Sequence, residues 1–206
     1  KEVTGFYISG HPLDDYSLEI ENFCDVTIGE VFNNISKYAG RQLTLAGMIS
    51  GATERMTQAG NYFGTFFLED FNDSRKFFLF SEDYLRFKHF LVDGTNVLVK
   101  VKVQFRRGGQ DQLEIKVNGI SLLAEALEKH TKSITITLKA GNIDKDLTGI
   151  LKKMMKAKKG SCMVKFRLEE ENSRKALHMQ PRTNGVDPLT FIRGIKQLKD
   201  ITYKIN

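Results

Sequence analysis

Residues 42–80, QLTLAGMISGATERMTQAGNYFGTFFLEDFNDSRKFFLF, decide the fold. Their apolar, aromatic and β-branched residues group into runs that predict three strands, Leu43–Thr53, Tyr62–Glu69 and Lys76–Phe80. The breaks between the runs are rich in residues that form turns. A glycine, Gly47, lies inside the first run, as is typical of a strongly bent strand. The stretch therefore predicts a small, strongly bent, three-stranded meander.

Downstream of the meander, the sequence predicts a short helix and two more strands. Residues 82–90 place aromatic and leucine side chains at helical spacing. Residues 94–107 alternate between valines on one face and lysines and other polar residues on the opposite face. A loop with paired glycines then leads to a fifth strand at 113–120. Five strands with a helix after the third is the OB-fold order, so we predict a five-stranded OB-fold barrel over residues 41–129.

The flanking segments predict a lead-in and a second domain. Residues 1–40 form a lead-in linker with short helices, one of which has Thr27 as its N-cap and Glu30 three residues on. Residues 130–206 follow the order βαββαβ, with Asp187 capping the last helix ahead of a proline. The fold class is therefore β plus α/β: the OB-fold barrel is followed by a small, basic, two-layer α/β domain. A ferredoxin-like arrangement is one candidate for that domain.

Positive charge is concentrated in the second half of the chain. The formal net charge is +6, but residues 1–128 carry 13 Lys and Arg against 18 Asp and Glu, whereas residues 129–206 carry 18 against 7. The OB half is thus acidic overall. This weakens a bulk-charge argument for nucleic-acid binding by the OB domain, while local basic patches remain possible there.

Cysteine usage and hydropathy indicate the compartment. The two cysteines, Cys24 and Cys162, lie far apart and predict buried free thiols, which suit a reducing cytoplasm. No apolar run is long enough to span a bilayer, and the chain begins at Lys1 without a leader. We therefore expect a cytoplasmic piece of a longer polypeptide with no membrane contact.

The sequence contains no recognisable catalytic or cofactor-binding motif. The phosphate-loop, dinucleotide-binding, zinc-protease, CxxC and nucleophile-elbow patterns are all missing from it. Adjacent carboxylates such as Asp14-Asp15 and Glu82-Asp83 fall at expected turns and strand ends, whereas a two-metal site needs acids that converge from separate strands. We expect no catalytic residue, no metal and no cofactor in this chain, and we favour a binding function.

Basic and aromatic residues around the predicted barrel favour nucleic-acid binding. OB-folds bind nucleic acid on the face of strands two and three and through the loops between strands one and two and strands four and five. Exposed rings there stack on bases, and the candidate rings are Tyr62, Phe63, Phe66 and Phe77, although the core is favoured for each phenylalanine. The predicted nucleic-acid-binding residues are Arg55, Asn61, Tyr62, Lys76, Lys100, Lys102, Arg106 and Arg107. The adjacent arginines of this set are the strongest phosphate candidates, because they lie in a glycine-rich loop.

The helix predicted at 144–158 carries a cluster of lysines on its outer face. Lys152, Lys153 and Lys156 are the predicted partner-binding residues of this cluster. A solvated helix face that ends in cations favoured by the helix dipole explains them at least as well.

The lead-in adds a family resemblance. The run Lys1-Glu2-x-x-Gly5-Phe6-Tyr7-Ile8-Ser9-Gly10-His11-Pro12-Leu13 resembles the segment that precedes the OB domain in the bacterial DNA polymerase III alpha subunit family. The stretches 45–49, 67–70 and 78–80 resemble the first three strands of that domain. The resemblance covers residues 1–125 and extends, in position and order of elements, to the second domain.

This resemblance has functional implications. It implies that the parent protein is a DNA-directed DNA polymerase and that the OB domain binds single-stranded template DNA. It also implies that the second domain docks on the tau-type subunit of the clamp loader, in the company of other replisome subunits. The family's catalytic carboxylates lie upstream of the matched region, so this chain is expected to be a non-catalytic part.

Two other classes of function compete with this interpretation. One is an RNA-binding OB domain like the anticodon-binding barrel of a class II aminoacyl-tRNA synthetase, although no synthetase signature follows residue 125. The other is a pure protein-interaction module, which the acidic OB half would suit. Side-by-side titration with tRNA, single-stranded DNA and a partner protein separates the three.

Overall fold

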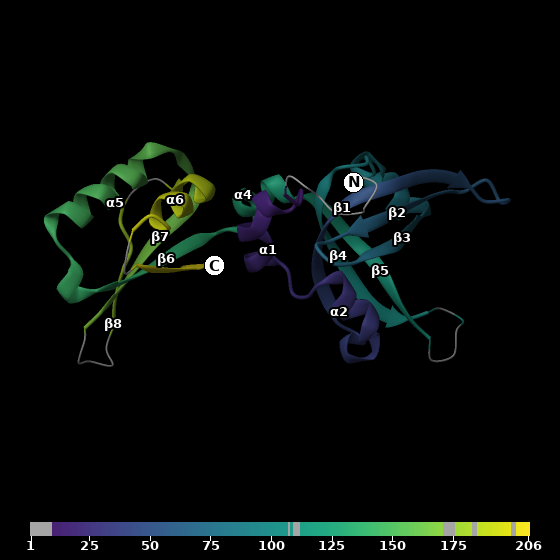
Figure 1. Ribbon diagram of the computed structural model, residues 1–206, viewed down its shortest axis with the longest axis horizontal. Coiled ribbons are helices and arrows are strands. Elements are labelled where there is room, and N and C mark those ends of the chain that lie inside the picture. Colours follow the sequence, from purple (N-terminus) through teal and green to yellow (C-terminus); the bar gives the residue numbers. More distant parts are fainter. Residues whose placement is uncertain (1–9, 107, 109–111, 171–175, 183–184, 199–200) are drawn as a thin grey trace. The chain divides into compact units, whose positions relative to one another are not determined.

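The computed structural model describes residues 10–106, 108, 112–170, 176–182, 185–198 and 201–206. Two compact units are present, divided between Ala126 and Leu127, and Figure 1 shows the elements of each. The first unit contains the five strands predicted for the OB-fold, and the second contains the predicted α/β elements.

The first unit begins with four short helices that contribute to its core. They are η1 (Asp14–Tyr16), α1 (Ser17–Phe23), α2 (Ile28–Asn33) and η2 (Ile35–Tyr38). The Thr27 hydroxyl accepts the Glu30 N–H at 3.2 Å, so the predicted N-cap of α2 is confirmed. Ile28 and Val31 are fully buried in the same apolar cluster as the strands. The lead-in is thus packed onto the OB sheet.

Five antiparallel strands form the sheet of the first unit. They are β1 (Gln42–Met56), β2 (Tyr62–Glu69), β3 (Ser74–Phe80), β4 (Asn96–Phe105) and β5 (Leu113–Leu122), in the order β3-β2-β1-β4-β5. The first half of β1 pairs with β4 and its second half with β2, and the register shifts between Ser50 and Thr53. Gly51, at φ +56°, lies within this shift and supplies the left-handed conformation that the bend requires.

Gly47 lies at a close approach between β1 and β2. A Cβ atom on this residue would lie 2.6 Å from Leu68 Cγ and 2.9 Å from the Glu69 carbonyl oxygen. Only a residue without a side chain fits at this position, because neighbouring backbone atoms cannot move away cheaply. The glycine therefore allows β2 to pack closely on β1 at the bend.

The sheet is not a closed barrel, which corrects the sequence prediction. Between the described residues of β3 and β5 there is no ladder of hydrogen bonds. The helix α3 (Ser81–Phe87) packs against β2, β3 and β5 at this seam, and Tyr84 and Phe87 from it are buried in the core. Lys116 of β5 also pairs with Asp83 of α3 at 3.5 Å. The helix predicted after the third strand is thus confirmed, and its side chains fill the space where the edge strands would have met.

The second unit has the predicted order βαββαβ. The short helix η3 (Lys88–Phe90) precedes β4 in the first unit. After β5 the chain continues through η4 (Leu123–Glu125) and α4 (Ala126–His130). The elements of the α/β unit are β6 (Ser133–Lys139), η5 (Ala140–Asn142), α5 (Lys145–Ala157), β7 (Lys159–Glu169), β8 (Ala176–Met179), α6 (Pro188–Ile195) and β9 (Thr202–Ile205). The Asp187 carboxylate accepts the Thr190 N–H at 2.9 Å, which confirms the predicted cap of α6.

The sheet order of the second unit is β8-β7-β6-β9, which is not ferredoxin-like. In the split βαβ of ferredoxin-like folds, another strand separates the two parallel strands that a helix joins. Here β6 and β7, joined by α5, pair directly in parallel register from Ser133↔Met163 onward. Ile134 and Ile136 of β6 and Phe191 and Ile192 of α6 are at most 1% exposed, so one face of the sheet is covered by helices.

Candidate nucleic-acid interface

Strand alternation divides the aromatic residues of β2 and β3 between the core and the surface. Phe66 and Leu68 of β2 and Phe77 and Leu79 of β3 are at most 2% exposed. The residues between them point to the opposite face, because successive side chains of a strand alternate. We call this outer set the aromatic face and define it as Phe63, Phe67, Lys76, Phe78 and Phe80.

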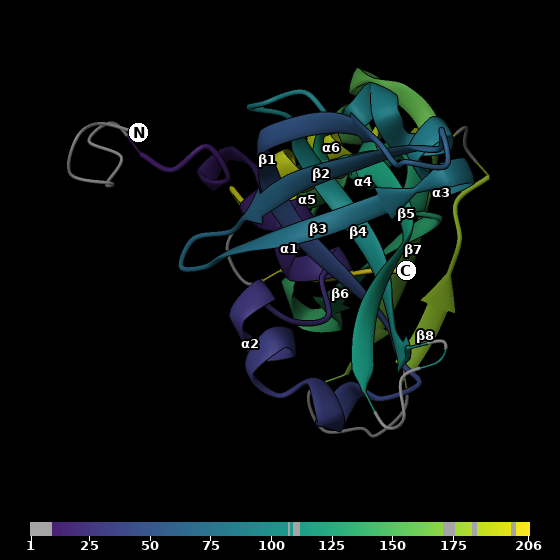
Figure 2. The same cartoon turned by 90° about the vertical axis from the view of Figure 1, so that its right-hand side faces the viewer.

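The register places these residues side by side. Phe63 lies opposite Phe80, and Phe67 lies opposite Lys76. Phe67, Phe78 and Phe80 are 38%, 50% and 57% exposed. Figure 2 shows β2 and β3 crossing the side of the first unit that is turned to the viewer. Three exposed rings on neighbouring strands form an apolar patch of the kind that marks a binding surface.

The rings of the aromatic face are ordered by their mutual contacts. The Phe78 and Phe80 rings are nearly parallel, with centroids 6.1 Å apart and an interplanar angle of 4°. The Phe63 ring lies 5.8 Å from that of Phe80 at an angle of 23°. Lys76 Nζ lies 5.8 Å from the Phe67 centroid and 5.7 Å from the Phe78 centroid. A cation held over two rings combines the chemistries that bind bases and phosphates.

Two features of β1 help to position the neighbouring side chains of β2. The Thr53 and Thr65 hydroxyls are 2.8 Å apart and form a hydrogen bond across the β1–β2 pair. A Cβ atom on Gly51 would lie 3.3 Å from the Phe67 ring, so the glycine leaves room for that ring. The face is therefore built on regular strands whose positions are fixed by neighbouring residues, which favours a preorganised site.

A hydrogen bond ties α3 to the second half of β1. The Tyr84 hydroxyl donates to the Glu54 carboxylate. This bond, together with the burial of the phenol, raises the pKa of Tyr84 to about 12. The contact helps to hold the helix against the end of the sheet next to the loop between β1 and β2.

Four of the predicted nucleic-acid-binding residues lie at or beside the aromatic face. Lys76 lies at one end of the face, opposite Phe67, and the exposed Arg55 lies on β1 opposite Phe63, at the other end. Tyr62, 48% exposed, begins β2, and Asn61 precedes it in a turn where its N–H donates to the Thr57 hydroxyl at 3.1 Å. Arg55, Asn61 and Tyr62 line the rim where β1 passes into β2.

Lys100 and Lys102 are not at the aromatic face. They pair with Thr44 and Gln42 in the first half of β1, whereas Phe67 pairs with Ser50. Ser50 is six positions further along β1 than Thr44, which is about 20 Å along the sheet. The structure therefore divides the sequence-predicted residues into two groups.

The β4–β5 hairpin holds the remaining predicted residues of the OB unit. Arg106 is exposed, and its N–H donates to the Gln112 carbonyl at 2.8 Å, which closes the hairpin just beyond Phe105. Arg107 lies outside the residues that the structure describes. The side-chain geometry of the predicted arginine pair is therefore known at Arg106 only.

Sequence reasoning missed three rings of the site. Phe66 and Phe77 are core residues as favoured, and Phe63 is half-buried on the outer face. The missed rings are Phe67, Phe78 and Phe80. The available signal was strand alternation: once Phe77 faces the core, Phe78 and Phe80 on β3 must face outward.

The lysine cluster of α5 is on the solvent side of that helix. Lys152, Lys153 and Lys156 are exposed, whereas Leu151 is 5% exposed and faces the core. Lys152 and Lys156 are four residues apart and lie on one ridge of the helix. This exposed ridge can meet an acidic partner without rearrangement of the unit.

Metal-binding clusters and cysteines are the other groups to consider in the described residues. Across these ranges, no group of three or more His, Cys, Asp or Glu could hold a metal ion. Cys24 and Cys162 are free, as predicted, and burial raises their pKa values to about 12 and about 11. Cys162 is buried, whereas Cys24 is only partly so. No helix in the described part of the chain is long and apolar enough to cross a membrane.

Comparison with known protein families identifies each unit. Residues 43–123 match the model of the OB-fold nucleic acid binding domain, which agrees with the strand order found here. The first unit is therefore an OB-fold nucleic-acid-binding domain. Residues 134–206 match the model of the DNA polymerase III alpha subunit, C-terminal domain.

Relatives along most of the chain agree with both matches. The DNA polymerase III subunit alpha of Saccharopolyspora erythraea is 27% identical over 174 residues, which cover 82% of this chain and 14% of that relative. The Deinococcus radiodurans subunit is 28% identical over 173 residues, covering 82% and 13%. The chain is thus similar along most of its length to bacterial DNA polymerase III alpha subunits, and its second unit matches their C-terminal domain. It spans only about one seventh of the length of these relatives.

Two solved structures show a partial likeness to this chain. The second OB-fold domain of replication protein A from Methanococcus maripaludis has a TM-score of 0.29 and 24% identity, and covers 43% of this chain and 91% of that chain. A mitochondrial single-stranded DNA binding protein from S. cerevisiae has a TM-score of 0.28 and 18% identity, covering 40% and 92%. Scores this low carry no structural argument, so the assignment rests on the family models and the relatives.

Proposed function

We propose that this part of a replicative DNA polymerase binds single-stranded DNA through the aromatic face of its OB unit. The main supporting observation is that the rings of Phe67, Phe78 and Phe80 are exposed on one face. Lys76 Nζ lies within 6 Å of two of them. Each ring offers a stacking platform for an unpaired base, and stacking is tolerant of sequence. A polymerase template presents such bases.

The charge distribution supports a site that depends on stacking. The OB half of the chain is acidic overall, so bulk attraction to phosphate is weak there. The cations that serve the site are local: Lys76, whose Nζ lies near the Phe67 and Phe78 rings, and Arg55 at the rim. Arg106 and Arg107 are proposed to contact phosphates beyond the aromatic face, and Lys100 and Lys102 are proposed as a more distant track for the strand.

The parent protein is proposed to be a DNA-directed DNA polymerase acting in DNA replication in the cytoplasm. Support comes from the two relatives described above, which are both DNA polymerase III alpha subunits. On this proposal, catalytic carboxylates belong to another part of the polymerase, and the residues described here bind and assemble without a cofactor.

Comparative titration tests the proposed ligand. Fluorescence anisotropy of a labelled 20-nucleotide oligothymidine, a blunt duplex of the same length and a tRNA is measured in one buffer. We expect the single strand to bind at least about tenfold more tightly than the duplex, because stacking on unpaired bases contributes about 1–3 kcal/mol per base. Preference for tRNA would instead favour the synthetase-like alternative. A lack of binding to all three, with capture by a partner protein, would favour a protein-interaction module.

The second unit is proposed to dock the tau-type subunit of the clamp loader. The exposed α5 ridge of Lys152, Lys153 and Lys156 supports this proposal, since it suits an acidic surface. Replacing all three lysines with glutamate is expected to weaken binding of a purified tau-type subunit at least tenfold, through like-charge repulsion. Surface plasmon resonance measures the change, with Lys165→Glu on the other side of the unit as the control. Equal affinity of wild type and triple variant would refute this assignment of the docking surface.

A further inference from the structure

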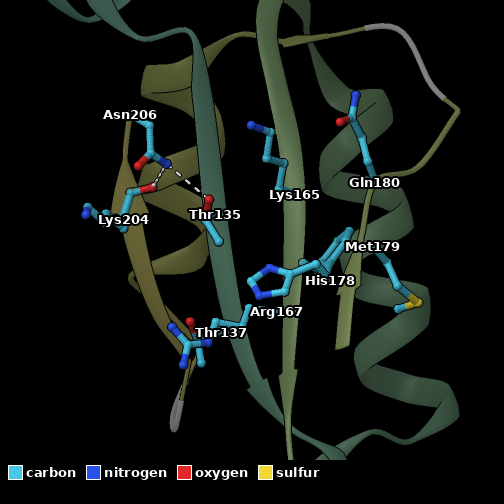
Figure 3. Close-up of a pocket in the computed structure, with 10 residues that line it drawn as sticks. Thr135, Thr137, Lys165, Arg167, His178, Met179, Gln180, Lys204 and Asn206 are labelled. Carbon is cyan, nitrogen blue, oxygen red and sulfur yellow. Dashed lines mark hydrogen bonds between the residues drawn. The ribbon is translucent and has the colours of Figure 1, made fainter. Parts of the chain in front are cut away.

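The sheet of the second unit has one face that the helices leave uncovered. In Figure 3, the strands lie in front of the helices and the labelled side chains project from the near face. This face encloses a hollow of about 510 Å³. Ten residues line it: Thr135, Thr137, Lys165, Phe166, Arg167, His178, Met179, Gln180, Lys204 and Asn206.

Strand register arranges the polar residues in rows across the sheet. Thr135 of β6 lies between Lys165 of β7 and Lys204 of β9. In the next row, Thr137 pairs with Arg167, which in turn pairs with His178. Adjacent strands are about 4.8 Å apart, so two lysines flank a threonine floor at a separation of about 10 Å. The hollow is thus a trough with hydroxyls at its base and ammonium groups on both sides.

The charge of this trough is entirely of one sign. Lys165, Arg167 and Lys204 are cationic, and none of the ten lining residues is acidic. Arg167 forms an ion pair with Glu169 at 2.9 Å, which partly neutralises the charge of Arg167. The two lysines therefore supply most of the positive potential in the trough. The unit contains both acidic and basic residues. If this face were only a solvated surface, we would expect acidic side chains among those that line it.

The donor chemistry of the trough suits phosphate. Asn206 Nδ2 donates to the Thr135 hydroxyl at 3.0 Å and so orients it. Lysine, arginine, threonine, asparagine and glutamine side chains are the groups that contact phosphate oxygens in nucleic-acid complexes. The one residue with a phenyl ring that lines the trough is Phe166. It is half-buried, and its strand position faces the helices on the other side of the sheet. Base stacking is therefore not its mode of recognition.

We infer that the uncovered sheet face of residues 133–206 is a second nucleic-acid-binding surface, which holds the phosphodiester backbone without reading bases. It is separate from the aromatic face of the OB unit, and it lies on the opposite side of its sheet from the α5 lysines. Its occupant is a nucleic-acid strand, either single or within a duplex, because both present the same backbone phosphates.

The salt dependence of binding tests this inference on the full chain. A duplex probe is used first, because its bases are paired and the aromatic face contributes little to its binding. The variant Lys165→Ala with Lys204→Ala is expected to reduce the slope of log Kobs against log salt by about 1.8, since each phosphate contact contributes about 0.9. With a single-stranded probe the expected reduction is about 1.4.

A matched variant controls for net charge. Lys152→Ala with Lys156→Ala removes the same charge from the helix side of the same unit and is expected to leave both slopes unchanged. Equal slope changes in the two double variants would overturn the inference, because the effect would then be one of net charge. Unchanged DNA slopes together with weakened binding of a polyglutamate peptide in the Lys165 and Lys204 variant would also overturn it, in favour of an acidic protein partner.

Discussion

Replacing Phe78 and Phe80 together with alanine is expected to weaken binding of single-stranded DNA by at least about 30-fold. The two rings are nearly parallel, exposed and next to each other on β3, so each can stack with a base. Stacking contributes about 1–3 kcal/mol per base, and the smaller value for two rings already corresponds to that factor. Anisotropy titration of a labelled 20-nucleotide oligothymidine against the full chain measures the change.

The control for this experiment is a ring of similar exposure away from the aromatic face. Phe71, 46% exposed, lies in the turn between β2 and β3, where its ring contacts that of His11. Phe71→Ala is expected to change affinity less than twofold. Far-UV circular dichroism should be the same for all variants, because Phe78 and Phe80 face away from the core. If the double variant retained wild-type affinity while folded, base stacking on this face would be wrong.

Local patterns in the sequence were sufficient to predict the strands. Valines alternate with lysines along β4, and turn residues mark both ends of β2. Both strands therefore follow from the alternating pattern and the flanking turn residues. Closure of the barrel was predicted incorrectly, because it depends on how α3 packs between β3 and β5. That packing is a long-range property which no local pattern encodes.

The site was harder to predict for a related reason. All of Phe77–Phe80 are apolar, so composition does not distinguish the core positions from the exposed ones. The distinction needs one anchored residue, after which alternation assigns the others. The trough of the second unit depends further on strand order. Lys165 and Lys204 are far apart in sequence and meet across Thr135 only because β7 and β9 both pair with β6.

The Phe66→Ala variant is expected to destabilise the OB unit by about 3–5 kcal/mol, which is the usual cost of deleting a buried phenyl ring. Phe66 is fully buried, and its ring stacks on that of Phe77 with centroids 5.6 Å apart. Phe77 in turn meets the edge of Phe32 from the lead-in, so the cavity would separate three elements. Because a domain is typically stable by only about 5–15 kcal/mol, most of the stability margin would be lost. Hydrogen exchange of the β2 and β3 amides measures the free energy of opening.

The neighbouring residue provides the matched control, since Phe67 is on the same strand but is 38% exposed on the aromatic face. Phe67→Ala is expected to cost about 1 kcal/mol or less in opening free energy, because Phe67 is on the exposed face of the sheet and its removal leaves little enclosed cavity. It should nevertheless weaken binding of the oligothymidine, whereas the surviving folded fraction of Phe66→Ala should bind normally. Exchange in the β6 and β7 amides should stay unchanged in both variants, as these strands belong to the other unit. If the two substitutions lowered protection of β2 equally, the division of this strand into a core face and a binding face would be incorrect.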